Sequence, residues 1–186
     1  MIKQIIRVDI IDSTQTALKE MAALGAPHGT VIVAEQQTAG RGQFERTWNS
    51  QKGGLFFSAL LRPSKKISQT SALTIKTAGA VVETLSEIYG IKSKIKKPND
   101  VLSYDKNKKE YLKICGILTE GSVTEISCDW IVLGVGINLN NNLDKKLTAT
   151  SVKKLLGREA DMREFENNLF NKLSQRYAQW LLSTED

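Results

Sequence analysis

Short runs of β-branched and aromatic residues, alternating with segments of helical spacing, constrain this fold more than any other feature of the chain. The runs TVIVAE (30–35) and GGLFFSALL (53–61) have the length of single strands, and turn residues bound them. The segment KQIIRVDI (3–10) has the same character near the N-terminus. We therefore predict strands in all three places, and the stretch TAGRGQFERTW (38–48) becomes a loop between two strands.

Four segments have the spacing or end signals of helices. Asp12 with Gln15 resembles a capping box, which predicts a helix that ends at Gly25. A second helix is expected over about 67–89, before Gly90, and SVKKLLG (151–157) predicts a short one. A last amphipathic helix, packed on the sheet, follows from the spacing of Met162, Phe165, Leu169, Leu173, Tyr177 and Trp180.

The region between the second and third of these helices reads as strands. Three candidates are present: IKSKIKKP (91–98), LKICGILTEG (112–121) and TEISCDWIVLGVGINLN (124–140). With 186 residues, 41% of them hydrophobic, the chain is long enough for one filled core and too short for two full domains. We expect a single domain covering residues 1–186.

The apolar segments and the two cysteines indicate the cellular compartment. No apolar run approaches a membrane span, and the N-terminus is too interrupted for a secretory signal, so a cytoplasmic protein without membrane contact is expected. Cys115 and Cys128 lie in apolar segments without metal-ligand spacing, which favours buried, reduced thiols.

A formal charge of +6 raises the question of a nucleic-acid partner. The lysines cluster in KSKIKK (92–97) and KNKK (106–109), where a solvated strand edge and a polar hairpin loop are the favoured interpretation. Aromatic residues, at 6% of the chain, leave little for base stacking. DNA binding is therefore not expected.

Several common chemistries are excluded or disfavoured. The chain has no GxxxxGK[ST] phosphate loop, and GVGIN (134–138) lacks the third glycine of a dinucleotide fingerprint. The two glycines of GVGIN at the end of a buried strand instead predict a backbone that another group approaches closely. His28 is the only histidine, and in the turn-like stretch GAPHGT it is best interpreted as a polar loop residue rather than a zinc ligand or triad member.

The remaining polar residues could converge on one site. Arg41 and Arg46, next to flexible glycines, would make an anion clamp. After Pro98, an amide and a carboxylate at positions 99 and 100 could turn inward, although such a sequence is also ordinary turn chemistry. Lys113 could enter a pocket or mark the solvent end of a strand.

Taken in order, five motifs resemble the catalytic domain of biotin protein ligases: DST (12–14), EQQTAGRG (35–42) with Arg46 and Trp48, KPND (97–100), KICGIL (113–118) and GVGIN (134–138). The resemblance implies an α+β fold, with a mixed β-sheet flanked by helices as in class II aminoacyl-tRNA synthetases. It implies formation of biotinyl-adenylate from biotin and ATP with Mg²⁺, then transfer to a lysine of the biotin carboxyl carrier protein domain of a biotin-dependent carboxylase.

The resemblance also assigns roles to residues. Lys113 and Arg41 are the expected catalytic residues, and Lys113 would bond the reacting carboxylate and phosphate oxygens. Biotin contacts are implied for Ser13, Thr14, Gln37, Gly40, Arg41, Ser58, Lys113, Gly116, Gly134 and Gly136. Nucleotide contacts are implied for Arg46, Trp48, Asn99, Asp100 and Asn138. No protein metal ligand is assigned.

The chain also departs from the family pattern. The loop usually reads GRGRxGRxW, whereas this chain has Gln43 for the second arginine and Glu45 for the second glycine, and Lys97 replaces the usual tryptophan before PND. Many relatives carry an N-terminal DNA-binding domain and a small C-terminal barrel. The residues before Asp12 leave no room for the first, and the final segment reads as one helix, so neither is expected in this sequence.

The sequence leaves two other functions open. It also leaves open whether the protein forms a homodimer. A lipoate or octanoate ligase or transferase would share the fold and the lysine, but its substrate has no urea edge for Gln37 and Ser13 to bind. A non-catalytic binding module on a decayed ligase scaffold draws support from Gln43 and the absent barrel. Against the latter, Lys113, Arg41 and Asn99 are all present.

Overall fold

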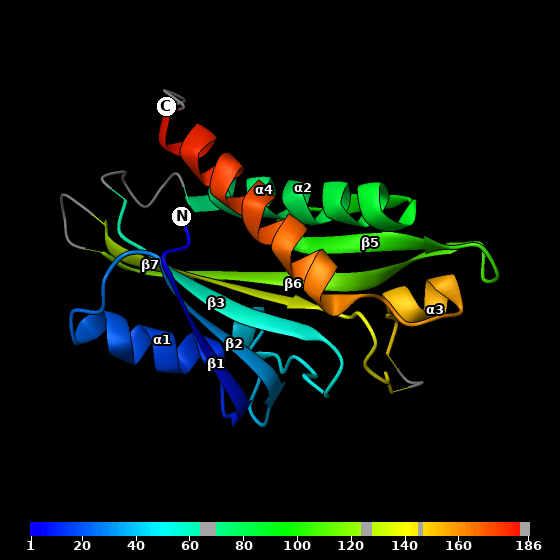
Figure 1. Cartoon of the computed structure of the whole chain (residues 1–186), viewed down its shortest axis with the longest axis horizontal. Helices are drawn as coiled ribbons and strands as arrows, with labels where there is room; N and C mark the ends of the chain where they lie inside the picture. The colour runs from blue at the N-terminus through cyan, green and yellow to red at the C-terminus, as the bar shows by residue number, and fades with distance from the viewer. Residues whose placement is uncertain (64–69, 124–127, 145–146, 183–186) are drawn as a thin grey trace.

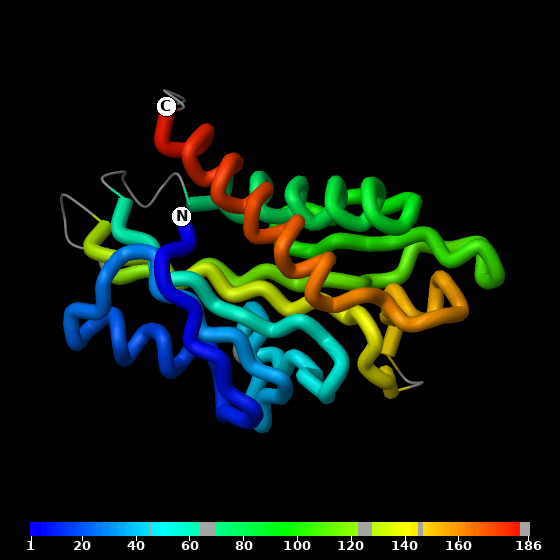
Figure 2. The backbone as a smooth tube through the Cα atoms, viewed as in Figure 1, coloured from blue at the N-terminus to red at the C-terminus, as the bar shows by residue number. Residues whose placement is uncertain are grey.

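A seven-stranded mixed sheet forms the centre of the computed structural model, which describes residues 1–63, 70–123, 128–144 and 147–182. The strands are β1 (Gln4–Ile11), β2 (Thr30–Gln37), β3 (Leu55–Leu61), β4 (Ser93–Lys96), β5 (Asp100–Asp105), β6 (Glu110–Val123) and β7 (Cys128–Ile137). Their order across the sheet is β1-β2-β3-β7-β6-β5-β4. β1 and β2 pair in parallel and the other neighbours pair antiparallel, so the expected mixed sheet is confirmed. In Figure 2 the blue β1 and the green β5 lie toward opposite edges.

Helices cover the two faces of the sheet unequally. The long helices α2 (Thr70–Tyr89) and α4 (Met162–Leu182) pack on one face and on each other, while α1 (Thr14–Ala23) lies on the opposite face, over β2, β3 and β7 (Figure 1). The short α3 (Val152–Leu156) precedes α4. Because successive strand residues point to opposite faces, β3 supplies both cores: Phe57 and Ala59 pack toward α2 and α4, and Leu60 packs toward α1.

Most predicted elements are confirmed, with corrections at their ends. The first helix is capped by Ser13, not Asp12, since the Ser13 side chain accepts a hydrogen bond from the Thr16 N–H. The strand predicted over 91–98 stops at Lys96, where proline at position 98 interrupts it. β5 was not predicted, although its side chains alternate strictly between half-buried and buried. Parts of two predictions, residues 67–69 and 124–127, lie outside the described residues.

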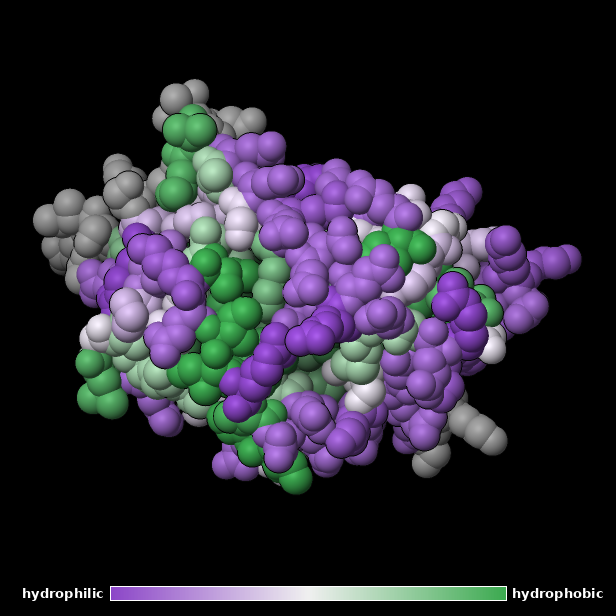
Figure 3. Space-filling model, in the orientation of Figure 1, coloured by the Kyte–Doolittle hydropathy of each residue, from purple (hydrophilic) through white to green (hydrophobic). Residues whose placement is uncertain are grey.

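The lysine-rich segments have the surface positions that the sequence predicted. β4 is an edge strand, and residues 106–109 form the turn between β5 and β6. Figure 3 shows a largely hydrophilic face whose hydrophobic surface gathers between α1 and α4; Ile5 and Ile10 of the edge strand β1 are exposed. None of the helices in the described part of the chain combines the length and the hydrophobicity of a membrane span.

Arg62, directly after β3, ties α1 to the sheet. Its guanidinium donates hydrogen bonds to the carbonyls of Ala22 and Ala26, at and after the end of α1, and to the carbonyl of Asp129 at the start of β7. The carbonyls at a helix C-terminus have no partner within the helix, so a cation with several donors stabilises them well.

We expect Arg62→Ala to lower the free energy of unfolding by about 2–3 kcal/mol, because it leaves carbonyls without their charged donor. Arg62→Lys keeps the charge but cannot reach all these acceptors, and should lie between the alanine variant and wild type. Urea unfolding followed by circular dichroism measures both. An alanine variant within about 0.5 kcal/mol of wild type, the usual range for surface changes, would contradict this role.

Candidate active site

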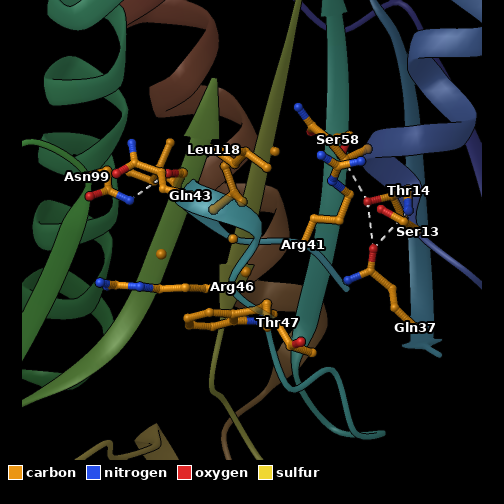
Figure 4. A pocket seen from close by; sticks show the side chains of 18 of the residues that line it. Ser13, Thr14, Gln37, Arg41, Gln43, Arg46, Thr47, Ser58, Asn99 and Leu118 are labelled. Atoms are coloured by element: carbon orange, nitrogen blue, oxygen red, sulfur yellow. Dashed lines mark hydrogen bonds between the residues drawn. The ribbon is translucent and has the colours of Figure 1, made fainter. Parts of the chain in front are cut away.

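The candidate site is a pocket on the face of the sheet that carries α1, beside the N-terminus of that helix. Its volume is about 150 Å³. In Figure 4, Ser13, Thr14, Gln37 and Ser58 lie on one side of it and Asn99 on the other. The lining residues are Ser13, Thr14, Gln15, Gln37, Arg41, Gly42, Gln43, Arg46, Thr47, Trp48, Phe57, Ser58, Asn99, Asp100, Lys113, Gly116, Ile117, Leu118, Gly134, Val135 and Gly136.

Three glycines keep the floor of this pocket flat. Gly134 and Gly136 of β7 and Gly116 of β6 point to the same face, because Gly116 pairs with Gly136 across the strands. A Cβ at Gly136 would lie 2.3 Å from Trp48 Nε1, and one at Gly116 would lie 2.9 Å from the same indole. The bare backbone therefore lets the Trp48 ring lie on the sheet, and the close approach predicted from GVGIN is confirmed.

A β-bulge directs Lys113 into the pocket. Lys113 and Gly116 are three positions apart, so in a regular strand they would point to opposite faces. The pairing instead shifts register: Cys115 pairs with Val101, whereas Lys113 pairs with Leu102. Ile114 and Cys115 consequently both enter the core on the other face, and Lys113 faces the pocket with Gly116.

Lys113 is the central cation of the site. Its Nζ lies 2.7 Å from Asp100 Oδ1, and 5.1 Å from the centre of the Trp48 ring. The Asp100 oxygen is thus paired with the Lys113 ammonium, although the contact lacks hydrogen-bond alignment. Trp48 Nε1 is buried without an acceptor. A buried donor of this kind is typical of a site whose partner is a ligand.

The opposite end of the pocket is polar and buried, and we call Thr14, Gln15, Gln37 and Ser58 the polar end. Gln37 Oε1 accepts hydrogen bonds from the Thr14 amide, at 2.8 Å, and from Thr14 Oγ1, at 3.0 Å. Thr14 Oγ1 lies 2.9 Å from Ser58 Oγ, which in turn lies 3.0 Å from Gln15 Oε1. Figure 4 shows the contacts among Thr14, Gln37 and Ser58 as dashed lines.

The glycine-rich loop between β2 and β3 covers the pocket. It contains one short 3₁₀ turn, η1 (Gln43–Glu45), and Arg41, Gln43 and Arg46 all line the cavity. Phe44 has a positive φ of 54° and is 87% exposed, so it points away from the protein. The loop thus brings two cations and one amide to the ligand space.

Thirteen of the fifteen predicted site residues line this pocket, and two do not. Gly40 lies at the base of the loop, where a Cβ would come within 2.5 Å of the Trp48 carbonyl. Asn138 is buried; its amide donates to the Thr150 carbonyl and accepts from Asn141. In this structure both residues shape the surroundings of the pocket. His28 is a loop residue outside the pocket whose Nδ1 accepts from the Arg62 N–H, as its interpretation required.

Sequence reasoning missed Gln15 and the apolar wall. Gln15 was assigned to a capping box, yet it lies over Gly134 and joins the polar end. Leu118 lies on the pocket face of β6, two positions after Gly116, and forms the apolar wall beside the Trp48 ring. The other apolar lining residues, Phe57, Ile117 and Val135, point into the core on the opposite face. That Leu118 faces the pocket follows from strand alternation once the register is known, which one sequence does not reveal. Cys115 and Cys128 are buried free thiols as expected, and burial raises the pKa of both.

Glu120 lies next to the polar end, outside the lining. It accepts hydrogen bonds from Lys19 Nζ at 2.7 Å and from Gln15 Nε2 at 2.9 Å, and lies 3.9 Å from Arg41. Burial alone would raise the pKa of Glu120, but these donors and the nearby positive charges outweigh it, so its pKa is lowered.

A carboxylate with a lowered pKa stabilises the folded state above its unfolded pKa, and this contribution is lost as the pH falls through the folded pKa. We therefore expect Glu120→Gln to reduce the free energy of unfolding at pH 7, and the difference from wild type to shrink as the pH falls below 4.5, the ordinary value. Urea unfolding at several pH values between 7 and 3 tests this. A difference that stays constant across the range would contradict it.

The comparisons with known proteins agree with this geometry. Residues 8–138 match the family described as "Biotin/lipoate A/B protein ligase family". The chain is 36% identical over 185 residues to the "Bifunctional ligase/repressor BirA" of Bacillus spizizenii (96% of this chain, 55% of that protein). It is 37% identical over 179 residues to the protein of that name from Bacillus subtilis (93% and 53%).

Among solved structures, the chain resembles the biotin protein ligase from Aquifex aeolicus in complex with biotin and ATP. The TM-score is 0.79 at 32% identity, over 96% of this chain and 72% of that one. The chain spans about half the length of the two Bacillus proteins. Because the family match covers the strands, the loop and the glycine floor that build the pocket, this chain belongs to the biotin/lipoate A/B protein ligase family.

Proposed function

We propose that this chain is an ATP-dependent biotin–protein ligase, which forms biotinyl-5′-AMP and transfers biotin to a lysine of a biotin carboxyl carrier protein. The observation that carries the proposal is a single pocket with a polar, oxygen-rich end, an apolar wall and a cationic end at Lys113 and Arg46. Biotin has the same sequence of parts: a urea edge, an apolar ring system and chain, and a carboxylate. The likeness to a ligase solved with biotin and ATP supports this reading.

In the first step a biotin carboxylate oxygen attacks the α-phosphorus of ATP. A new O–P bond forms, the bond from that phosphorus to the bridging oxygen of the β-phosphate breaks, and pyrophosphate leaves. Negative charge gathers on the phosphate oxygens in the transition state. Lys113, held in place by the bulge and half-buried beside Asp100, is suited to stabilise that charge without reorganising.

In the second step the carrier lysine's amine attacks the biotinyl carbonyl carbon. The C–O bond to the phosphate breaks, AMP leaves and the amine loses its proton, which gives an amide. The mixed anhydride must be kept from water between the steps. We propose that the loop with Arg41, Arg46 and Trp48 covers it, because these residues already line the pocket.

The nucleotide end has few acidic groups. Asp100 is the one carboxylate among the lining residues, and the described residues contain no cluster of three potential metal ligands. This fits Mg²⁺ that arrives bound to the phosphates of ATP and takes at most one protein carboxylate. Asn99, whose amide is fixed to the Ile117 carbonyl, would lie beside the nucleotide. For Asn138 we propose an indirect role, through the backbone of Thr150.

A lipoate or octanoate ligase is the second candidate, and the family name includes it. The polar end argues against it. Thr14, Gln37 and Ser58 form an acceptor-rich cluster, and a dithiolane or alkyl chain has no donor for it. Burying these polar groups against an apolar ligand without hydrogen bonds costs free energy.

Free thiols at Cys115 and Cys128 suit a reducing compartment such as the cytoplasm.

The transfer reaction tests the proposal. Purified chain, biotin, ATP and Mg²⁺ are incubated with a carrier domain, and labelling is detected with streptavidin and by mass spectrometry. The mass of one biotinyl group should appear on the carrier's acceptor lysine, and a carrier with arginine there should stay unlabelled. Labelling by lipoate in place of biotin would favour the second candidate.

Gln43 allows a prediction about how long the adenylate is retained. It lines the pocket where the family pattern has arginine, so Gln43→Arg should add one charge-assisted hydrogen bond to the phosphate, worth roughly 1.5–3 kcal/mol. We expect adenylate to be released at least about 10-fold more slowly, as measured by chasing labelled adenylate from the protein. Phe44→Arg, a neighbouring cation at an exposed position, is the matched control and should leave release unchanged. Equal release rates in all three proteins would mean that charge at position 43 does not hold the adenylate.

A further inference from the structure

Glu120 has contacts that the proposed reaction does not use. It lies on β6, on the same face as Gly116 and Leu118, but behind the polar end rather than in the cavity. Its two carboxylate oxygens are divided between neighbours: Oε1 accepts from Lys19 and Oε2 accepts from Gln15. One oxygen is therefore dedicated to a side chain that does line the pocket.

This contact fixes which way the Gln15 amide points. Gln15 Nε2 lies 2.9 Å from Glu120 Oε2 and 3.1 Å from the Val132 carbonyl oxygen. Both partners only accept hydrogen bonds, so the NH₂ group must face them. Gln15 Oε1 is thereby turned to the opposite side, over Gly134 and 3.0 Å from Ser58 Oγ.

At the other side of the polar end, the Gln37 amide is also fixed with its oxygen toward the pocket. Its Oε1 accepts from the Thr14 backbone N–H, which can only donate. Its Nε2 lies 2.7 Å from Ser50 Oγ, which can accept from it. Two amides thus present oxygen, not nitrogen, to the same space.

Between these two amides there are fewer hydroxyl hydrogens than oxygen–oxygen contacts. Gln37 Oε1, Thr14 Oγ1, Ser58 Oγ and Gln15 Oε1 form a row of oxygens with consecutive separations of 3.0, 2.9 and 3.0 Å. Thr14 and Ser58 supply one hydroxyl hydrogen each, so one contact in the row always lacks a donor. A buried row of this kind is completed by a ligand that brings N–H groups.

We propose that Glu120 is a positioning residue that sets the hydrogen-bond polarity of the polar end: by holding the Gln15 NH₂ group, it keeps the pocket selective for ligands that present N–H donors. That the ligand is biotin rests on the proposed function. Recognition of the biotin urea N–H groups by the pocket would then depend on the Glu120 carboxylate, which the ligand does not touch.

Titration calorimetry with biotin, and with analogues in which one or the other ring N–H is replaced by oxygen, tests the proposal. Wild type should bind biotin at least about 10-fold more tightly than the oxygen analogues, because these put an acceptor against the row. In Glu120→Ala the charged acceptor is gone and, of the two acceptors, the neutral Val132 carbonyl is left to hold the Gln15 NH₂ group. Gln15 can then rotate and offer NH₂ to the row, so biotin should bind about 10-fold more weakly and the preference over the analogues should narrow.

Two matched variants separate positioning from charge. Lys19→Ala removes the ion pair but leaves Glu120 in contact with Gln15. Glu120→Gln has one acceptor oxygen for two donors, so it is combined with Lys19→Ala, which leaves that oxygen to Gln15. Lys19→Ala and this double variant should both stay within about threefold of wild type. Gln15→Met, which removes the amide, should reproduce the weaker binding of Glu120→Ala and decides the matter if Glu120→Ala fails to fold.

The outcomes are distinct. An unchanged preference for biotin over the oxygen analogues in both Glu120→Ala and Gln15→Met would overturn the proposal. So would an equal loss of biotin binding in Glu120→Ala and in the double variant Glu120→Gln with Lys19→Ala, because charge would then be the cause. Wild type that binds no biotin at all would overturn the proposed function as well.

Discussion

Replacing Lys113 with alanine is expected to lower the rate of adenylate formation by about 100- to 1,000-fold, the effect of removing one preorganised charge donor from a transition state. Lys113 Nζ is the cation that the bulge in β6 directs into the pocket, beside Asp100 and the face of Trp48. The measurement is single-turnover formation of labelled adenylate from saturating biotin and ATP, so that the chemical step is observed rather than substrate affinity.

The fold of Lys113→Ala should change little, since about a third of the Lys113 side chain is exposed and such ion pairs contribute little to stability. Lys108→Ala, which removes an exposed lysine from the β5–β6 turn, is the matched control and should keep the wild-type rate. Adenylate formation by Lys113→Ala within about threefold of wild type would return this lysine to the role of a solvent-facing strand residue.

The second large effect is expected at Gly134. Its missing side chain leaves room for the Gln15 amide, and an added Cβ would lie 2.4 Å from Gln15 Oε1. Overpacking of this kind costs about 1–3 kcal/mol. We expect Gly134→Ala to displace Gln15 from the polar end and to weaken biotin binding by about 10- to 100-fold, as measured by calorimetry.

A double-mutant cycle isolates the clash at Gly134. In a Gln15→Ala background the nearest atom is gone, so Gly134→Ala should lower the free energy of unfolding much less than it does in wild type. Equal destabilisation in the two backgrounds would show that Gly134 is required for another reason, such as the backbone of Leu118, whose carbonyl lies 3.4 Å from the added atom.

The sequence predicted elements and loops well where composition and period agree. The runs at β2 and β3 are rich in β-branched and aromatic residues, and the spacing of the last helix is regular over its whole length. The glycines of GVGIN announced a close approach because strand glycines have few other uses. What approaches was not predictable, since Trp48 belongs to a distant loop.

The sequence did not predict features that depend on pairing between strands. β5 was missed because several of its buried positions hold polar residues, so its sequence shows no alternation of hydrophobic and polar side chains. The alternation is one of burial, and it arises only when α2 and the core cover one face of the strand. The bulge that directs Lys113 into the pocket cannot be recognised in the sequence KICGIL, because it is defined by the register of β5 against β6. Gln15 was misassigned for the same reason: its partners Glu120 and Val132 are remote in sequence.

Exchange of labelled pyrophosphate into ATP shows whether this pocket activates the biotin carboxylate, and it needs no carrier protein. With ATP, Mg²⁺ and biotin we expect label to enter ATP, and we expect no exchange when biotin is omitted or replaced by lipoate or octanoate. Absence of biotin-dependent exchange in correctly folded protein, or exchange that lipoate supports and biotin does not, would mean that this chain is not a biotin ligase.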